Sequence, residues 1–286
     1  MILTNSSAAK VGNSNVTAIA SATETLRQIM CYAATTISSA ITGTTGLVIN
    51  GTAQLTLSGT CNYTGPTQIN SGTLSITGAS VLNGVISGSG SLSKSGSLAV
   101  TLGGNNTYSG GTNYSSSAGA ASITFSSGNV FGTGLVTCSG TCQIITGNSV
   151  TVPNNFQLNS GSITQYRVNT QTTTVTLLGS ISGAGSVNKT ANGILILSGT
   201  LTYTGQTIIT AGTIRASKAT GSSTATASFT TATTLSVSFN VPPDAGTQTF
   251  RFFQGSTSRT YTAVTLVNAP GRTATYDSTT STLTVT

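Results

Sequence analysis

Three copies of one short pattern recur along the chain, and this repetition limits the folds that the chain can adopt. Each copy places a Gly before a central Tyr and a Thr four residues after it, and the copies are Leu57–Thr67, Leu102–Thr112 and Leu197–Thr207. The central residues, Tyr63, Tyr108 and Tyr203, lie 45 and 95 residues apart. We infer a repeat of about 45 residues with a degraded copy near 140–165, and repetition at this period is typical of solenoids, propellers and arrays.

Short alternating runs decide among these architectures. Apolar and polar residues alternate over a few positions and the runs end near Gly, as in 54–58, 72–77, 193–197 and 211–214. Strands this short are stable when each one stacks on the equivalent strand of the next coil, at about 4.8 Å, and buries its apolar side. A propeller blade of this length usually carries a Trp-containing signature, and the chain has no Trp. The sequence therefore predicts an all-β fold, a parallel β-helix (β-solenoid).

Charged residues are scarce, which limits the chemistry that the chain can perform. Of its 286 residues, 10 are Lys or Arg, 3 are Asp or Glu and none is His, although 37% are hydrophobic and a folded core is expected. General acid–base catalysis depends mostly on such groups, and the acidic side chains are Glu24, Asp244 and Asp277. We therefore expect no enzymatic activity, no catalytic residue, no bound cofactor and no metal site.

The net charge of +7 comes from dispersed cations rather than from a cluster. Nucleic-acid grooves usually concentrate their cations, so we expect no specific binding to nucleic acid. The amino-terminal residues lack the basic and apolar regions of a secretory signal, and no run of about 18 apolar residues predicts a transmembrane segment. The chain is expected to be a mature form or to leave a cytoplasm by another route, such as assembly into a virus particle.

Three linked motifs carry a family resemblance. Ile86–Lys94 and Ile181–Lys189 share Ile-Ser-Gly-x-Gly-Ser-Leu/Val-x-Lys, the tyrosine pattern is Leu-x-Leu-Ser-Gly-x-x-x-Tyr-x-Gly-x-Thr, and Ile-x-x-Gly-Thr-Leu/Ile follows it. Over roughly residues 41–217, this combination resembles the autotransporter-associated β-strand repeat. The resemblance implies a right-handed parallel β-helix of the passenger type, an extracellular scaffold often involved in adhesion or surface structure, and no catalytic residue. No signal peptide is visible and the remaining residues are too few for a translocator barrel, so a self-secreting autotransporter is not expected.

The amino-terminal end of the predicted solenoid needs cover, because open sheet edges aggregate. Ser21–Glu24 has a capping-box pattern. Apolar residues then follow at helical spacing, namely Leu26, Ile29, Met30, Ala33 and Ile37. We predict a short amphipathic helix over 22–35 that caps the first coil, with docking onto a partner as the alternative.

The carboxy-terminal region alternates differently from the repeats. From about residue 234, apolar residues recur at every second position, which predicts an antiparallel β cap with Phe252 and Phe253 in its core. The predicted organisation has three parts: an amino-terminal arm with the capping helix over 1–40, β-solenoid repeats over 41–218, and a junction with the carboxy-terminal β cap over 219–286.

Four cysteines are candidate reactive groups. Cys138 and Cys142 could form a disulfide if Gly140 makes a tight turn, but in an extended strand their Cα atoms would lie about 13 Å apart, beyond bridging distance. We therefore expect free buried thiols at these two positions and at Cys31 and Cys61. A zinc site is not expected because the four spacings are unrelated and the chain has no His.

The repeated polar and aromatic residues are the other candidates. The three tyrosines are expected to pack against the neighbouring coil, with an exposed row that stacks on sugars as the alternative. Lys94 and Lys189 are expected to point outward into solvent. Asn-x-Ser/Thr triplets arise by chance in a chain rich in Ser and Thr, and they are glycosylation sites only in a secretory lumen; they begin at Asn5, Asn15, Asn50, Asn62, Asn105, Asn113 and Asn188.

A low-charge β-solenoid of this kind could serve one of three functions. The leading hypothesis is a non-enzymatic structural protein of a particle surface, such as a virion fibre, spike or capsid-associated subunit. Its partners would be copies of itself, neighbouring coat proteins or host-surface glycans. The alternative is a secreted or cell-surface bacterial adhesin of the autotransporter-passenger kind. A polysaccharide-cleaving β-helix enzyme is disfavoured because glycoside hydrolysis typically needs a pair of carboxylates.

Overall fold

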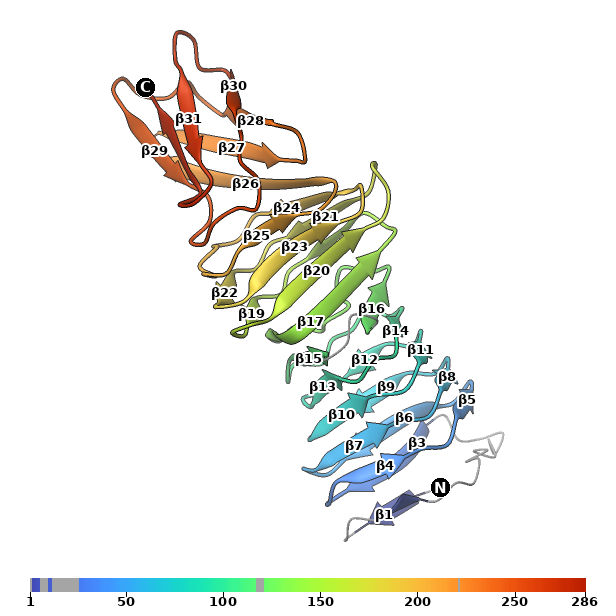
Figure 1. The fold of residues 1–286 in the computed structure, drawn as a ribbon. Helices are drawn as coiled ribbons and strands as arrows, with labels where there is room; N and C mark the ends of the chain where they lie inside the picture. Colours follow the sequence, from blue (N-terminus) through green and yellow to red (C-terminus); the bar gives the residue numbers. More distant parts are fainter. Residues whose placement is uncertain (1, 6–9, 12–25, 117–120, 221) are drawn as a thin grey trace. The chain divides into compact units, whose positions relative to one another are not determined.

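A computed structural model describes residues 2–5, 10–11, 26–116, 121–220 and 222–286. Every regular element among these residues is a β-strand (Figure 1). The chain divides into two compact units, one made of 1–145 with 152–155 and the other of 146–151 with 156–286. Parallel strand pairing dominates the first unit and much of the second, so the predicted all-β solenoid is confirmed.

The first unit is a parallel β-solenoid whose strands form three faces. The first face contains β1 (Ile2–Asn5), β3 (Leu26–Cys31), β6 (Gly46–Asn50), β9 (Thr67–Ile69) and β12 (Ile86–Ser87). The second face contains β2 (Lys10–Val11), β4 (Thr35–Ile37), β7 (Gln54–Leu57), β10 (Thr73–Ile76), β13 (Ser91–Lys94), β15 (Thr112–Ser116) and the first part of β17 (Val136–Thr146). The third face contains β5 (Ile41–Gly43), β8 (Cys61–Tyr63), β11 (Ser80–Leu82), β14 (Val100–Leu102), β16 (Ser122–Phe125) and the second part of β17.

One turn in this unit is much shorter than the sequence repeat. Thr73 Oγ1 lies 2.8 Å from Ser91 Oγ, 18 residues further along the chain. Ser71 Oγ donates a hydrogen bond to the carbonyl of Gly51, 20 residues earlier. The sequence repeat of about 45 residues therefore covers more than two turns of the solenoid.

The core consists of ladders of inward side chains, as the alternating pattern predicts. Leu55, Leu74 and Leu92 lie in register on neighbouring strands of the second face, and all three are fully buried. Gln54, which precedes Leu55, is exposed, whereas Thr56 and Ser93 between inward positions are half-buried. Burying one such leucine contributes about 1.5–3 kcal/mol, so the ladders stabilise strands that are too short to form alone.

The second unit begins with parallel ladders of the same kind. They contain β18 (Val150–Val152), β19 (Phe156–Leu158), β20 (Ile163–Val168), β21 (Thr174–Leu177), β22 (Ile181–Gly183), β23 (Ser186–Thr190), β24 (Ile194–Leu197), β25 (Thr207–Ile209) and β26 (Thr213–Thr220). The parallel pairs include β21 with β24 and β24 with β26, where Val175, Leu195 and Ile214 form a buried ladder.

The carboxy-terminal region changes to antiparallel pairing, as predicted. β26 pairs antiparallel with β27 (Ser223–Phe229), which pairs antiparallel with β28 (Thr234–Phe239), whereas β28 pairs parallel with β30 (Ala263–Val267). A further sheet contains β29 (Gln248–Arg251), β31 (Ala274–Asp277) and β32 (Thr282–Val285), all antiparallel. Phe252 and Phe253 are buried against the ring of Phe229, at centroid distances of 5.4 and 5.1 Å.

The amino-terminal helix predicted over 22–35 is wrong wherever the structure describes this segment. Residues 22–25 lie outside the described residues, but Leu26–Cys31 form strand β3, which pairs in parallel with β1 and β6. Within β3, Ile29 and Cys31 are buried and Gln28 is exposed, which is the period of a strand. The edge of β6 offers a full row of backbone partners, and such tertiary pairing overrides a short helical pattern.

Candidate functional site

The repeated tyrosines lie inside the solenoid, each paired with the threonine four residues later. The hydroxyl oxygens of Tyr63, Tyr108 and Tyr203 each lie 2.6 Å from the Oγ1 atoms of Thr67, Thr112 and Thr207. All six side chains are buried, so an exposed row of tyrosines that stacks on sugars is excluded. Burial raises the pKa values of Tyr108 and Tyr203 above the usual 10.0, and these phenols stay protonated at neutral pH. The pairs satisfy buried hydroxyl groups and present no reactive group to solvent.

The two repeated lysines are also buried, and the expectation that they point into solvent is wrong. Lys94 is 1% exposed and Lys189 is fully buried. Lys94 occupies an inward ladder position between Ile76 and Tyr114, and Lys189 occupies one between Tyr166 and Ile209.

The ammonium groups of these lysines bind the carbonyl oxygens of the turn that follows each strand. Lys94 Nζ donates to the carbonyl of Ser95 at 2.7 Å. Lys189 Nζ donates to the carbonyls of Thr190 and Ala191, both at 2.7 Å. Burial lowers the pKa of Lys94, and it lowers the pKa of Lys189 to about 8. Each lysine therefore binds backbone carbonyls at the end of its strand or just beyond it.

All four cysteines are buried thiols outside any disulfide bond, as expected. Burial raises the pKa values of Cys31 and Cys61. Cys142 Sγ donates to the carbonyl of Tyr114 at 3.2 Å, and its thiol contacts the thiol of Cys138. This contact corresponds to the alternative in which Gly140 makes a tight turn, whereas the extended strand would keep the two thiols apart.

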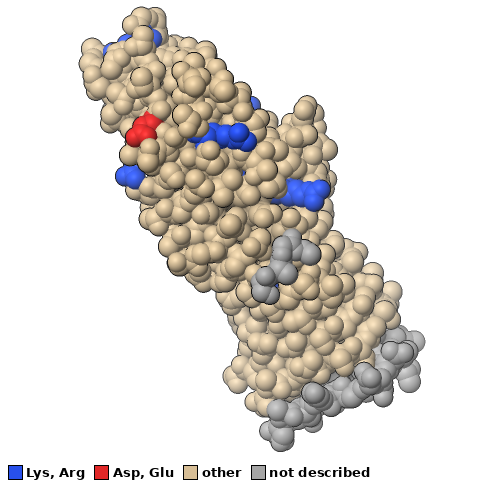
Figure 2. All heavy atoms as spheres, viewed as in Figure 1, with Lys and Arg blue, Asp and Glu red and all other residues tan. Residues whose placement is uncertain are grey.

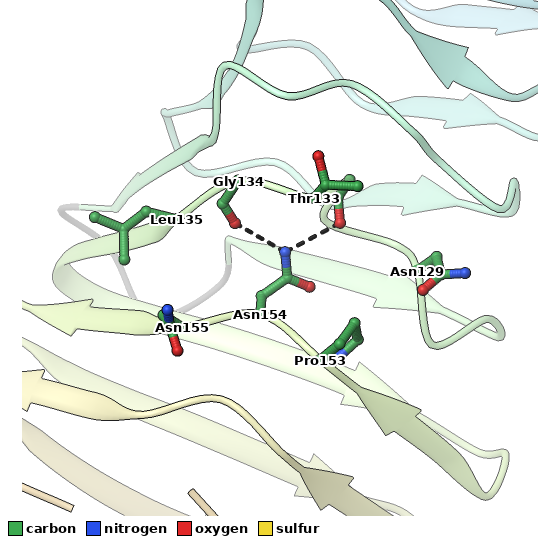
Figure 3. Close-up of a pocket in the computed structure, with 8 residues that line it drawn as sticks. Asn129, Thr133, Gly134, Leu135, Pro153, Asn154 and Asn155 are labelled. Atoms are coloured by element: carbon green, nitrogen blue, oxygen red, sulfur yellow. Dashed lines mark hydrogen bonds between the residues drawn. The ribbon is translucent and has the colours of Figure 1, made fainter. Parts of the chain in front are cut away.

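A hollow in the first unit is the most developed candidate binding site. It has a cavity volume of about 290 Å³ and is lined by Asn129, Gly132, Thr133, Gly134, Leu135, Pro153, Asn154 and Asn155. Asn154 Nδ2 donates to the carbonyls of Gly132 and Gly134, at 3.0 and 2.9 Å (Figure 3). Its Oδ1 atom is buried and has no hydrogen-bond partner among the described residues. The hollow therefore offers amide and carbonyl groups to a small neutral donor, such as a water molecule or a sugar hydroxyl group, and none of its lining residues is ionisable.

A second hollow lies in the second unit. It has a cavity volume of about 260 Å³ and is lined by Ser198, Gly199, Thr200, Leu201, Ser217, Lys218, Ala219 and Phe252. Its lining includes hydroxyl groups and one cation, without a carboxylate or a thiol. Sequence reasoning missed both hollows, because no motif distinguishes their Asn, Ser and Thr residues from the many others in the chain.

The visible surface carries few charges. Figure 2 shows a face on which Lys and Arg side chains lie apart from one another and most atoms belong to uncharged residues. Among the described residues, no group of three or more His, Cys, Asp or Glu side chains could hold a metal ion. The part of the chain that the structure describes has no helix long and apolar enough to cross a membrane.

These features define a class of protein, a parallel β-solenoid whose turns enclose buried Tyr–Thr pairs. Three segments, 47–76, 92–113 and 187–216, match the passenger-associated-transport-repeat family. Each matched segment contains one Tyr–Thr pair, and the second and third also contain Lys94 and Lys189. The resemblance to an autotransporter passenger repeat is thus confirmed. No curated protein and no solved structure matches the chain.

Proposed function

We propose that the chain is a secreted or cell-surface structural protein of the autotransporter-passenger kind, and that it acts as an adhesive scaffold without catalysis. The observation that carries this proposal is the triple match to a passenger-associated repeat, on segments that fold as turns of a parallel β-solenoid. The match supports an extracellular or cell-surface location. It gives no support to the virion hypothesis, which the adhesin alternative therefore replaces.

The absence of catalysis is proposed from the state of the acidic groups that the structure describes. Asp244 Oδ1 accepts a hydrogen bond from Ser222 Oγ at 3.0 Å. Asp277 accepts hydrogen bonds from the Thr279 amide and the Thr280 hydroxyl, both at 2.8 Å, and these bonds lower the pKa of its carboxyl group. Both carboxylates are exposed and bonded to nearby turn residues, which suits turn stabilisation better than proton transfer.

Adhesion is proposed from the neutral polar groups on the outside of the first face. Asn70 Nδ2 donates to Asn50 Oδ1 of the neighbouring turn at 2.8 Å, and Gln68 Nε2 donates to Asn70 Oδ1 at the same distance. Such rows present amide groups at the spacing of the strands, and amides hydrogen-bond the hydroxyl groups of sugars. Neutral surface glycans are therefore the proposed partners.

Location can be tested on intact cells of the source organism. An antibody raised against the purified chain should detect it in the outer-membrane or culture-supernatant fraction. Protease added to intact cells should remove the cell-associated signal while a cytoplasmic marker protein stays intact. A signal that is protected together with the cytoplasmic marker and absent from the supernatant would contradict the proposal.

Adhesion and the lack of catalysis need a separate assay. The purified chain should bind immobilised neutral glycans with little dependence on salt, and it should release no reducing ends from soluble polysaccharides. Replacing Asn70 with Leu on the exposed side should weaken binding, while the matched change of Thr204 to Val, also exposed, serves as a control. Measurable glycan cleavage would rule out the scaffold.

A further inference from the structure

The segment from Cys138 to Cys142 turns a corner between two faces of the solenoid. Val136–Gly140 pair with Thr112–Ser116 in the second face, and Gln143–Ile145 pair with Ser122–Thr124 in the third. Gly140, at the corner, has a φ of 71°, which residues with a side chain rarely adopt. The corner therefore replaces the extended geometry that would separate the two cysteines by about 13 Å.

Both cysteines point to the inside of this corner. The side chains of Cys138 and Cys142 are fully buried, whereas Gly140 between them is exposed. The two thiols are hydrogen-bonded to each other, and Cys142 Sγ also donates to the carbonyls of Tyr114 and Ser139, at 3.2 and 3.4 Å. Thiols in mutual contact need only small side-chain rotations to reach bonding distance.

The surroundings hold this pair in place. Tyr114 lies beside Cys138 in the ladder. Its hydroxyl group donates to the carbonyl of Ala121 at 2.9 Å and accepts from the amide of Gln143 at 2.9 Å. These bonds tie the second and third faces together next to the corner and hold its backbone in place.

We propose that Cys138 and Cys142 form an intramolecular disulfide bond when the chain folds in contact with a thiol–disulfide oxidant. One thiolate attacks a small disulfide such as oxidised glutathione, which forms a mixed disulfide and releases one glutathione thiolate. The second cysteine thiolate then attacks the protein-bound sulfur and releases the second glutathione. The protein loses two protons and two electrons, and the electrons reduce the oxidant to two thiols.

The proposed extracellular location supplies the oxidising surroundings, so the occurrence of the bond in cells rests on the proposed function. The geometry of the pair does not, because it depends only on the folded chain. Buried thiols exchange slowly, so the bond should form while the corner folds, when the two thiols come together and the oxidant can still reach them.

The test is to refold the purified full chain from urea in a buffer with an excess of oxidised glutathione. Free thiols are then alkylated in denaturant and the chain is digested with trypsin. Cleavage after Lys94 and Arg167 releases one peptide with Cys138 and Cys142, while cleavage after Arg27 and Lys94 releases another with Cys31 and Cys61. The peptide with Cys138 and Cys142 should have a mass two hydrogen atoms below that of its reduced form and carry no alkyl group. The peptide with Cys31 and Cys61 should carry two alkyl groups.

Matched variants complete the experiment. Cys138→Ala should restore one alkylated thiol in the first peptide, whereas Cys61→Ala should leave its bond unchanged. Reduction should lower the Tm of the oxidised parent by about 4 °C and leave a Cys138→Ala/Cys142→Ala double variant unaffected. Two alkylated thiols in the first peptide of the refolded parent, or a bond to Cys31 or Cys61, would overturn the proposal. Because this oxidation is performed on purified protein, its outcome is independent of the cell-surface experiment.

Discussion

The hydroxyl oxygen of Tyr203 lies 2.6 Å from Oγ1 of Thr207, and both groups are buried where water cannot replace either partner. The same contact, with the same distance, occurs between Tyr63 and Thr67. The motif Tyr-x-Gly-x-Thr therefore encodes a local hydrogen bond as well as a turn. A buried phenol that loses its partner retains the full cost of desolvation.

Replacing Thr207 with Val should lower the free energy of unfolding by about 1–3 kcal/mol, because the Tyr203 hydroxyl group would lose its partner. Urea denaturation followed by circular dichroism measures this loss. Adding Tyr203→Phe should recover part of it, since neither polar group then remains. Thr204→Val, on an exposed neighbour, should change the stability by less than about 0.5 kcal/mol. Equal effects of the two threonine changes would contradict the assigned role of the pair.

Leu195→Asp should destabilise the second unit by at least about 3 kcal/mol, because it places an unpaired charge in a dry ladder. Leu195 is fully buried between Val175 and Ile214. The matched change Ser198→Asp introduces the same charge at an exposed position on the same segment and should be nearly neutral. Thermal melts of the two variants compare them directly, and a parental Tm for Leu195→Asp would mean that the register is wrong.

Lys189 should contribute stability that rises between pH 8 and about pH 10, while the buried cysteines, whose pKa values are raised, contribute stability that falls over the same range. The pKa of Lys189 is lowered from 10.5 to about 8, so over this range the unfolded lysine binds more protons than the folded one and its contribution to the free energy of unfolding increases with pH. The pKa values of Tyr261 and Tyr276 are raised from 10.0 to about 12, so above pH 10 the folded chain retains protons that the unfolded chain releases, and stability declines.

Urea midpoints measured at closely spaced pH values test this profile. The difference in free energy of unfolding between the parent and Lys189→Met should rise between pH 8 and 10, because the cysteine and tyrosine contributions are common to both proteins. Lys94, whose pKa is also lowered, should contribute a rise of the same sign to both. A difference that is flat or falls across pH 8–10 would show that the Lys189 amine is not desolvated in the folded chain.

Gly140→Ala should lower stability by about 2 kcal/mol or more, because a Cβ atom there would collide with the carbonyl oxygen of Ser116 and the φ of 71° disfavours a side chain. Gly147→Ala is the control, since no heavy atom lies within 4 Å of the Cβ position at that residue. Chemical denaturation of both variants gives the comparison. Equal stabilities would argue against a tight corner at Gly140.

The alternation of apolar and polar residues correctly predicts the buried ladders. The same alternation places the repeated lysines inside the solenoid, contrary to the expectation that they point into solvent. In Ser91–Lys94 the period of two places Lys94 on the same side as Leu92, which is the inside. The prediction that Lys94 points into solvent came from the charge of its ammonium group. The ammonium group binds the carbonyl of Ser95, the next residue along the chain. The alternating pattern does not indicate that the backbone turns this carbonyl toward the lysine.

Two other features depended on information outside their own segments. The sequence of Leu26–Cys31 fits the period of a helix and of a strand, and the available edge of β6 decides for the strand. The contact of Cys138 with Cys142 requires a corner between two faces, for which Gly140 is the only local signal. The hollow around Asn154 depends on backbone carbonyls of the preceding turn, which no side-chain motif can indicate.

The mismatch between the turn and the sequence repeat determines how this solenoid can be lengthened. The copies of the tyrosine motif lie on different faces of the solenoid. Tyr63 belongs to β8 in the third face. The residues that flank Tyr108 lie at the first face, because the amides of Thr107 and Ser109 bind the carbonyls of Ile86 and Gly88 there. A 45-residue duplication would therefore rotate every downstream outer residue to another side. An inserted block of 18 to 20 residues, matched to one turn, would extend the molecule while each downstream group keeps its orientation.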